Sequence, residues 1–214
     1  CKGVDAGYKV IVVLAGAHNN LRTQTQIRLE EGFLGYSTID EDLDRRETTG
    51  VGLISPPHVI PDTITTRGDN GDFKTSVAKN FAINPGGNPL LFVVKKNTTV
   101  LKNLHNWVRD VARTQGQKLI RAVPLLVIDD ESDYASVDTK KQEYDFDNIP
   151  DPEHDPTAIN RWIRLILRSF EQSVYIGYTA TPFANIFIHE KAVSEEHGED
   201  LFPRSFIFSL PVPS

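Results

Sequence analysis

The chain has 214 residues, 39% hydrophobic and 24% charged, which is long enough and apolar enough for a sizeable globular core. Its formal net charge of -6 excludes a uniformly basic surface that coats nucleic acid, although a local basic groove remains compatible with it. Its one cysteine, Cys1, excludes an internal disulfide framework and a cysteine-rich zinc site, and is typical of the reducing cytoplasm. No apolar run approaches the length of a membrane span, so we expect a cytoplasmic chain without membrane contact.

The first third of the chain predicts a helix end, a strand, a helix and then an irregular insertion. Residues 1–7 resemble the end of a helix, and residues 8–14 form an apolar, β-prone run. Asn20 is suited to cap a helix over residues 21–33, and Gly35 is suited to end it. Residues 36–88 contain a charge run and several turn signals, so we expect an irregular insertion with one or two short strands.

Strands and helices alternate along the rest of the chain. Residues 90–94 predict a buried strand, and a helix with apolar residues at helical spacing follows from Thr98 and stops at Gly116. Residues 125–128 predict a third strand, and Asp155 with Pro156 starts a helix that runs to about Phe170. Residues 174–178 predict a fourth strand, and residues 206–210 are a candidate fifth. This alternation predicts an α/β fold with a mainly parallel sheet flanked by helices.

An acidic cluster follows the third predicted strand. The strand is apolar throughout, as expected for a strand buried on both faces, and it ends in four acids, Asp129, Asp130, Glu131 and Asp133. Acids at the carboxyl end of such a strand lie where open α/β sheets bind ligands. One carboxylate there can hold Mg²⁺ on a nucleotide while its neighbour orients the attacking water. The alternative interpretation is a solvated turn or the cap of the next helix.

A second motif follows the fourth predicted strand, where residues 179–182 read Thr-Ala-Thr-Pro. The order of strand, acidic cluster, helix, strand and paired hydroxyl groups favours a nucleotide hydrolase over a solvated turn. A metal-dependent nuclease centre built from the four acids is a weaker alternative. It requires a lysine or a further carboxylate nearby, and Lys140 with Lys141 is only a weak candidate for the lysine.

The order of these motifs resembles the first RecA-like domain of superfamily 2 helicases. Residues 130–133 resemble motif II and residues 179–182 resemble motif III, whereas residues 21–24 and 95–97 lie where motifs Ia and Ib are expected. The sequence is more specifically similar to the Z-one domain family in three segments, LAGAHNNLRTQTQIRLEEGF, VIDDESDYAS and YIGYTATPFANIFI. The resemblance extends from about residue 5 to residue 213 and is least distinct over residues 36–88.

The resemblance implies a function and a set of site residues. Members of the Z-one family are helicase-like proteins of bacteria, and some are ATPase subunits of ATP-dependent restriction systems that work beside a separate nuclease. The implied cofactors are ATP and Mg²⁺, and the implied partners are DNA and a nuclease subunit. Asp130 is expected to hold Mg²⁺, Glu131 to activate water, and Asp133 to couple the site to Thr179 and Thr181. Six residues are expected to contact the nucleic-acid backbone, namely Arg22, Gln24, Thr25, Lys95, Lys96 and Asn97. The alternative interpretation is that they are ordinary polar residues of the surface. Asp129 is expected to be a structural cap.

The sequence departs from the family at one point. Such ATPases hold the β- and γ-phosphates with a Gly-Lys-Ser/Thr loop, but no Gly-Lys pair occurs here, and residues 71–75 imitate the loop poorly. The resemblance places that loop upstream of Cys1, so residues 1–214 are expected to be a fragment of one RecA-like domain, inactive when isolated and lacking the second RecA-like domain. The alternative is a degenerate, non-catalytic scaffold that docks a nuclease.

Overall fold

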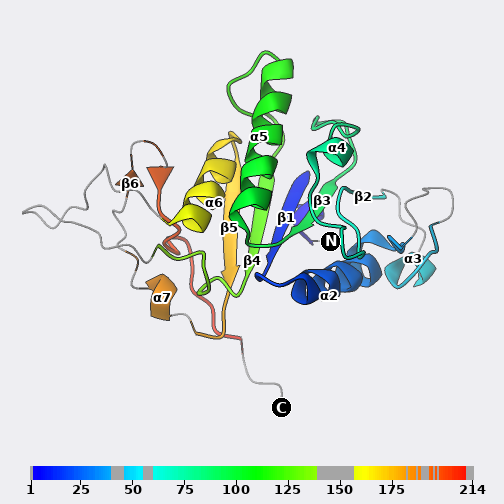
Figure 1. Cartoon of the computed structure of the whole chain (residues 1–214), viewed down its shortest axis with the longest axis horizontal. Coiled ribbons are helices and arrows are strands. Elements are labelled where there is room, and N and C mark those ends of the chain that lie inside the picture. The colour runs from blue at the N-terminus through cyan, green and yellow to red at the C-terminus, as the bar shows by residue number, and fades with distance from the viewer. Residues whose placement is uncertain are drawn as a thin grey trace, which may run out of the picture.

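The computed structural model describes residues 2–39, 46–54, 60–138, 157–181, 183–186, 188, 193–194, 196 and 198–210. Its centre is a five-stranded sheet in the order β2-β3-β1-β4-β5, in which every neighbouring pair is parallel (Figure 1). The strands are β1 (Val10–Ala15), β2 (Asp62–Thr63), β3 (Leu90–Val94), β4 (Leu125–Asp130) and β5 (Ser173–Tyr178). The predicted α/β class is therefore confirmed, and the arrangement is consistent with a RecA-like fold.

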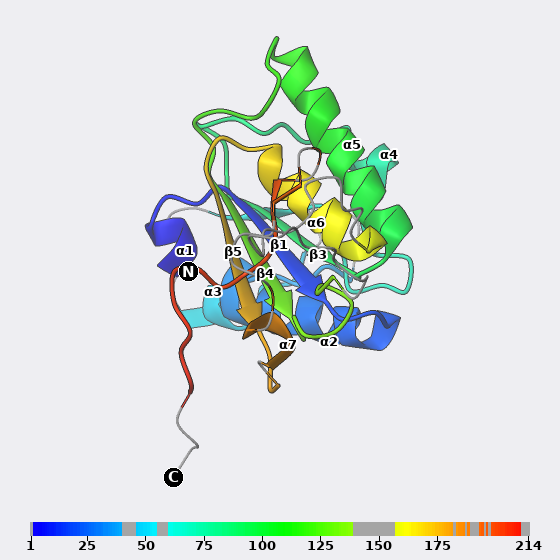
Figure 2. The same cartoon turned by 90° about the vertical axis from the view of Figure 1, so that its left-hand side faces the viewer.

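Helices cover both faces of this sheet (Figure 2). One face carries α5 (Thr98–Thr114) and α6 (Ala158–Arg168). The opposite face carries α1 (Lys2–Asp5), α2 (Asn19–Leu29) and its π-helical continuation η1 (Glu30–Leu34). The shorter elements are α3 (Val51–Ile54), α4 (Thr75–Ala78), α7 (Phe183–Ile186) and an antiparallel pair, β6 (Val193–Ser194) with β7 (Gly198–Glu199).

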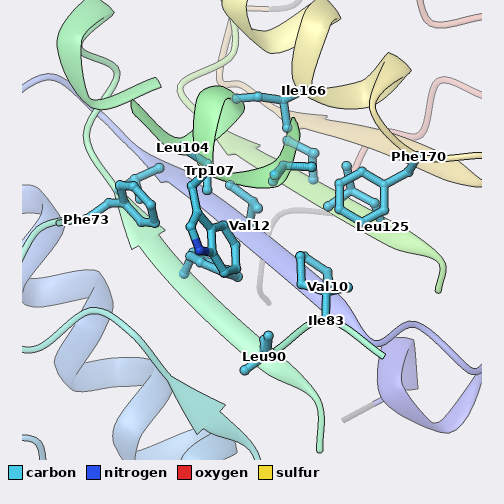
Figure 3. Packing of buried hydrophobic residues seen from close by; sticks show 14 of the residues in the cluster. Val10, Val12, Phe73, Ile83, Leu90, Leu104, Trp107, Leu125, Ile166 and Phe170 are labelled. Atoms are coloured by element: carbon cyan, nitrogen blue, oxygen red, sulfur yellow. The ribbon is translucent and has the colours of Figure 1, made fainter. Parts of the chain in front are cut away.

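The larger core lies between the sheet and the pair α5 and α6 (Figure 3). Alternate residues of β1, including Val10 and Val12, point into this core, whereas Ile11 and Val13 point into a smaller core on the α2 face. Because both faces are covered, β1 has no polar side to alternate with, which explains its continuous apolar run. The ring centroids of Phe73, Phe92 and Trp107 lie within 6.1 Å of one another, so Phe73 packs the insertion against β3 and α5.

The buried stripe that runs from α2 into η1 is polar, with Arg22, Gln26 and Glu30 four residues apart and all 0% exposed. Arg22 donates to the carbonyl oxygens of Thr66 and Gly68, both at 2.8 Å, and to that of Gly71 at 3.3 Å. Gln26 accepts a hydrogen bond from Thr65 at 2.9 Å, and Glu30 accepts bonds from Thr38 and Arg67. This stripe therefore fastens residues 65–71 of the insertion to α2 and η1.

Most predicted boundaries are close to the observed ones, with two corrections. The predicted cap at Asn20 is wrong, because α2 begins at Asn19 with His18 at the capping position. The candidate strand at residues 206–210 is also wrong, because this segment is extended coil with exposed side chains at Phe206 and Phe208. Gly35 and Gly116 end their helices as predicted, with φ angles of 80° and 69°. The predicted helix start at residues 155–156 lies outside the described residues.

Among the helices that the structure describes, none combines the length and apolar character needed to cross a membrane.

Candidate active site

The carboxyl ends of β1, β4 and β5 lie side by side, with Ala15, Asp130 and Tyr178 in one row of the sheet. The next helix after β1 is α2, on one face, and the next helix after β4 is α6, on the other. Neighbouring strands whose connections leave on opposite faces form the crevice where open parallel sheets bind ligands. Residues 130–135, which we call the acid turn, begin at this crevice, beside the segment that leads from β5 to α7 (Figure 2).

Asp129 is the buried acid of the cluster and lies beneath the acid turn. Its side chain is 0% exposed, and the Lys96 ammonium lies 2.8 Å from its Oδ1 atom. The Tyr175 hydroxyl donates a hydrogen bond of 2.6 Å to its Oδ2 atom. Burial and the Asp129 carboxylate raise the pKa of Tyr175, which keeps the phenol protonated as a donor. Asp129 therefore has a structural role, as expected. It acts as the partner of the buried Lys96, however, and not as a cap.

Asp130 and Glu131 are the exposed acids at the crevice. Glu131 has a left-handed backbone conformation with φ of 54°. A Cβ atom added to Gly16, which also has a positive φ, would lie 3.5 Å from Glu131 Oε2 and 2.9 Å from Leu21 Cδ1. The Glu131 side chain thus leans over the end of β1, where glycine leaves room for the neighbouring side chains.

The two exposed carboxylates fit the ligand requirements of Mg²⁺ on a nucleotide. This ion takes one or two protein carboxylates and completes its coordination with phosphate oxygens and water. Within the described part of the chain, no group of three or more His, Cys, Asp or Glu side chains is arranged to hold a metal by itself. Asp130 is exposed at the crevice and is available to such an ion, while its role as a ligand stays a prediction.

Ser132 joins the acid turn to β5. Its backbone N–H donates to the carbonyl oxygen of Tyr178 at 2.9 Å, and its side chain is 1% exposed. A Cβ atom on Gly177 would lie 2.7 Å from Ser132 Oγ and 2.9 Å from Ser132 Cβ. Glycine at position 177 is thus required for the acid turn to pack directly on β5.

Asp133 accepts hydrogen bonds from both threonines of the segment after β5. Thr179 Oγ1 lies 2.6 Å from Asp133 Oδ1, and Thr181 Oγ1 donates to Oδ2. The Thr181 backbone N–H in turn donates to Thr179 Oγ1 at 2.9 Å. The bonds from Thr179 and Thr181 lower the pKa of Asp133, because they stabilise its charged form. The hydrogen bonds expected from the sequence are present, while the coupling role assigned to them stays a prediction.

Three of the residues expected at a nucleic-acid backbone follow β3 and have different environments. Lys96 is 4% exposed, and its ammonium donates to the carbonyl oxygens of Glu131 and Tyr134. Asn97 caps α5, accepting the N–H of Thr99 at 2.9 Å. Lys95 is partly exposed, with its ammonium 3.9 Å from an Asp72 carboxylate oxygen. Of these three, only Lys95 keeps a partly exposed charged group.

The other three residues of that group lie on α2. Arg22 is buried and bonded to backbone carbonyls, so in this structure its guanidinium supports residues 66–71. Gln24 is exposed and Thr25 is partly exposed. The structure therefore separates the predicted set into side chains held inside the protein and side chains available at the surface. Whether the latter contact a nucleic acid stays a prediction.

Two site residues, Tyr175 and Gly177, were not identified from the sequence. Both belong to the run of β5, where each has an ordinary structural explanation as a strand residue. A glycine inside a strand often marks the close approach of another segment, and that signal was available at Gly177. The pairing of Lys96 with Asp129 had no local signal, because the two residues meet only when β3 and β4 take their places on either side of β1.

Comparisons of the chain with protein-family models, with curated proteins and with solved structures found no match.

Proposed function

We propose that this chain is part of a helicase-like ATPase of the Z-one domain type, which couples ATP hydrolysis to translocation or remodelling of DNA. The observation that carries the proposal is the joining of two motifs across one crevice: Asp133 of the acid turn accepts hydrogen bonds from Thr179 and Thr181. Motifs II and III of superfamily 2 helicases have the same residue types in the same chain order. The switch of connections between β1 and β4 supports a ligand site at this place.

The acids of the turn divide the chemistry between them. Asp130 would hold the Mg²⁺ of a bound nucleotide, and that ion would offset the negative charge that develops on the phosphates. Glu131 lies at the exposed end of the crevice, where it orients the attacking water and accepts a proton from that water. Asp133 stays ionised because Thr179 and Thr181 stabilise its charged form. Because Asp133 is hydrogen-bonded to Thr179 and Thr181, a movement of the acid turn also moves the segment that follows β5.

DNA is the proposed partner through contacts to the phosphate backbone, which position a protein without reading base sequence. Gln24, Thr25 and Lys95 make these contacts, because their side chains are at least partly exposed. A separate nuclease subunit and a cytoplasmic location complete the proposal, the latter in keeping with the chain's single cysteine.

The test is Glu131→Gln in the full-length protein, where the resemblance places a Gly-Lys loop before Cys1. We expect ATP hydrolysis to fall by about 10²-fold or more, because the variant removes the base that activates water. ATP affinity should change little, because the amide keeps the size of the side chain. Steady-state hydrolysis and equilibrium nucleotide binding measure the two effects separately.

The matched control is Glu171→Gln, the same change at an exposed residue beyond α6, which should leave hydrolysis unaltered. Normal turnover by Glu131→Gln would exclude the assigned role. A wild-type protein that neither binds nor hydrolyses ATP would instead favour the non-catalytic scaffold that docks a nuclease. Metal-dependent cleavage of DNA by this chain without ATP would favour the nuclease alternative.

A further inference from the structure

A buried lysine lies beneath the acid turn and contacts three strand ends. Lys96 follows β3, and its side chain is 0% exposed. Its backbone N–H donates to the carbonyl oxygen of Gly16, after β1, at 2.8 Å. Its ammonium donates to the carbonyl oxygens of Glu131 and Tyr134, the latter at 3.1 Å, and faces the Asp129 carboxylate at 2.8 Å. Lys96 thus joins the end of β3 to that of β1 through its backbone and to that of β4 through its side chain.

The carbonyl groups that Lys96 binds belong to the strained parts of the acid turn. Glu131 and Ala135 have φ angles of 54° and 62°, in the left-handed region that residues other than glycine seldom occupy. Such a conformation costs about 1–3 kcal/mol and persists only where the surroundings stabilise it. Lys96 binds the carbonyl of Glu131 itself and the carbonyl of Tyr134, which directly precedes Ala135. The ammonium therefore holds the acid turn at both strained positions.

The need to neutralise the charge of Asp129 does not by itself explain why a lysine is buried at position 96. A buried ion pair loses so much hydration that well-packed apolar residues are often at least as stabilising. Apolar replacements lack donors, however, and the donors of Lys96 are directed at the acid turn. The Tyr175 hydroxyl, from β5, fixes the Asp129 carboxylate at 2.6 Å, so the lysine's counter-ion is itself held in place.

We propose that Lys96 is a positioning residue that sets the orientation of Glu131 at the crevice, with Asp129 and Tyr175 holding the lysine. Lys96 does not touch the reacting atoms. It acts by keeping the acid turn in the left-handed conformation that places the Glu131 carboxylate over the end of β1. The inference rests on the proposed function, which assigns activation of water to that carboxylate.

The test is the paired variant Lys96→Met with Asp129→Asn in the full-length protein. It removes both charges together and keeps an acceptor for Tyr175, so no unpaired charge is left buried. We expect native circular dichroism and at least about tenfold faster amide hydrogen exchange in the peptide spanning residues 131–135, because two charge-assisted hydrogen bonds are lost. We also expect kcat for ATP hydrolysis to fall at least about tenfold, with KM changing much less, because an interaction that serves the transition state is lost.

The control is Glu30→Gln with Arg67→Met, the same kind of change at an ion pair that joins η1 to the insertion. It should leave exchange at residues 131–135 and the kcat unchanged. Unaltered hydrogen exchange at residues 131–135 in the paired variant would overturn the inference. Lys96 would then serve only to neutralise the charge of Asp129. Faster exchange in a protein whose wild type hydrolyses no ATP would mean that the proposed function fails while the clamp on the acid turn stands.

Tyr175→Phe provides a second variant that keeps the ring and removes only the hydroxyl. If the paired variant does not fold, this variant decides. We expect exchange at residues 131–135 to rise by a smaller factor than in the paired variant, because the Asp129 carboxylate is then less firmly held. Exchange equal to that of the wild type would overturn the inference.

Discussion

Asp133 is the residue of the acid turn whose protonation is controlled most directly by its neighbours. The hydrogen bonds from Thr179 and Thr181 lower its pKa, with burial acting weakly in the other direction. A carboxyl whose pKa is lower in the folded than in the unfolded state stabilises the fold above its unfolded pKa. That contribution is lost as the pH falls through the folded pKa. The threonines therefore stabilise the fold at neutral pH but not in strong acid.

The double variant Thr179→Ala, Thr181→Ala should raise the pKa of Asp133 toward its ordinary value of about 4, because both donors to the charged form are removed. Titration of the Asp133 carboxyl carbon by NMR measures this directly. The variant should also unfold more easily than the wild type at pH 7, with the difference shrinking below about pH 4. Thr114→Ala, which removes a hydroxyl bonded only within α5, should leave the titration unchanged.

The same double variant tests the coupling assigned to these residues. Some ATP hydrolysis should remain, because Asp130 and Glu131 are intact, but translocation or ATP-stimulated DNA cleavage should be lost. Translocation assays on the full-length protein, run in parallel with phosphate release, separate the two activities. Retention of both activities by the double variant would contradict the coupling.

At the scale of elements, α2 is unusual because its buried face is polar. Arg22, Gln26 and Glu30 are successive members of the i, i+4 row that normally packs apolar side chains onto a sheet. Here the row bonds the backbone and side chains of residues 65–71, which belong to no helix or strand that would supply partners for their carbonyl groups. The helix thus positions an irregular segment, and its stability depends on hydrogen bonds more than on apolar burial.

Arg22→Met should lower the free energy of unfolding by about 3 kcal/mol, because it leaves the carbonyls of Thr66 and Gly68 without the charged donor that the buried Arg22 supplies. Urea denaturation followed by circular dichroism measures the change. Arg28→Met, the same substitution on the exposed face of α2, should stay within about 0.5 kcal/mol of the wild type. Equal losses in the two variants would show that the buried hydrogen bonds do not stabilise the fold as inferred.

At the scale of the whole molecule, the sheet is asymmetric. β1 and β4 have partners on both sides, whereas β5 pairs only with β4 among the described strands. β5 is nevertheless as apolar as a central strand, and Val174 and Tyr178 are 38% and 51% exposed. An apolar edge strand presents unpaired backbone groups to any other extended segment, including one from a second copy. Among the described residues, no strand pairs with this edge of β5.

Val174→Lys should reduce self-association of this chain at high concentration, because a charged side chain on an edge strand opposes pairing with another strand. Static light scattering over a concentration series measures the effect. Leu53→Lys, a similar change at a residue 73% exposed on α3, should have no such effect, since α3 is not part of the sheet. Equal scattering from the Val174→Lys variant and the wild type would show that the edge is already covered.

The sequence predicted the main strands and helices because their signals are local. The strand at residues 90–94 was placed with its observed bounds, since an uninterrupted apolar run between turn residues suits a strand covered on both faces. Gly35 and Gly116 marked helix ends because each takes a positive φ that other residues avoid. The same reasoning wrongly predicted a strand at residues 206–210, because β propensity alone does not make a strand unless the segment pairs with another strand.

What the sequence determined by itself is the order of strands and helices, because each of their signals depends on residues close together along the chain. The expected pairing of Asp133 with Thr179 and Thr181 came from the order of motifs in the family that the sequence resembles, because these residues lie far apart along the chain. Only the tertiary structure decided which charged residues face solvent. Lysine and arginine are usually surface residues, yet Lys96 and Arg22 are both buried because distant segments supply their partners. Lys96 pairs with Asp129, and Arg22 donates to carbonyl groups of residues 66–71. Burial of a charge depends on where its counter-charge or acceptor lies in space, and spacing along the chain does not encode that.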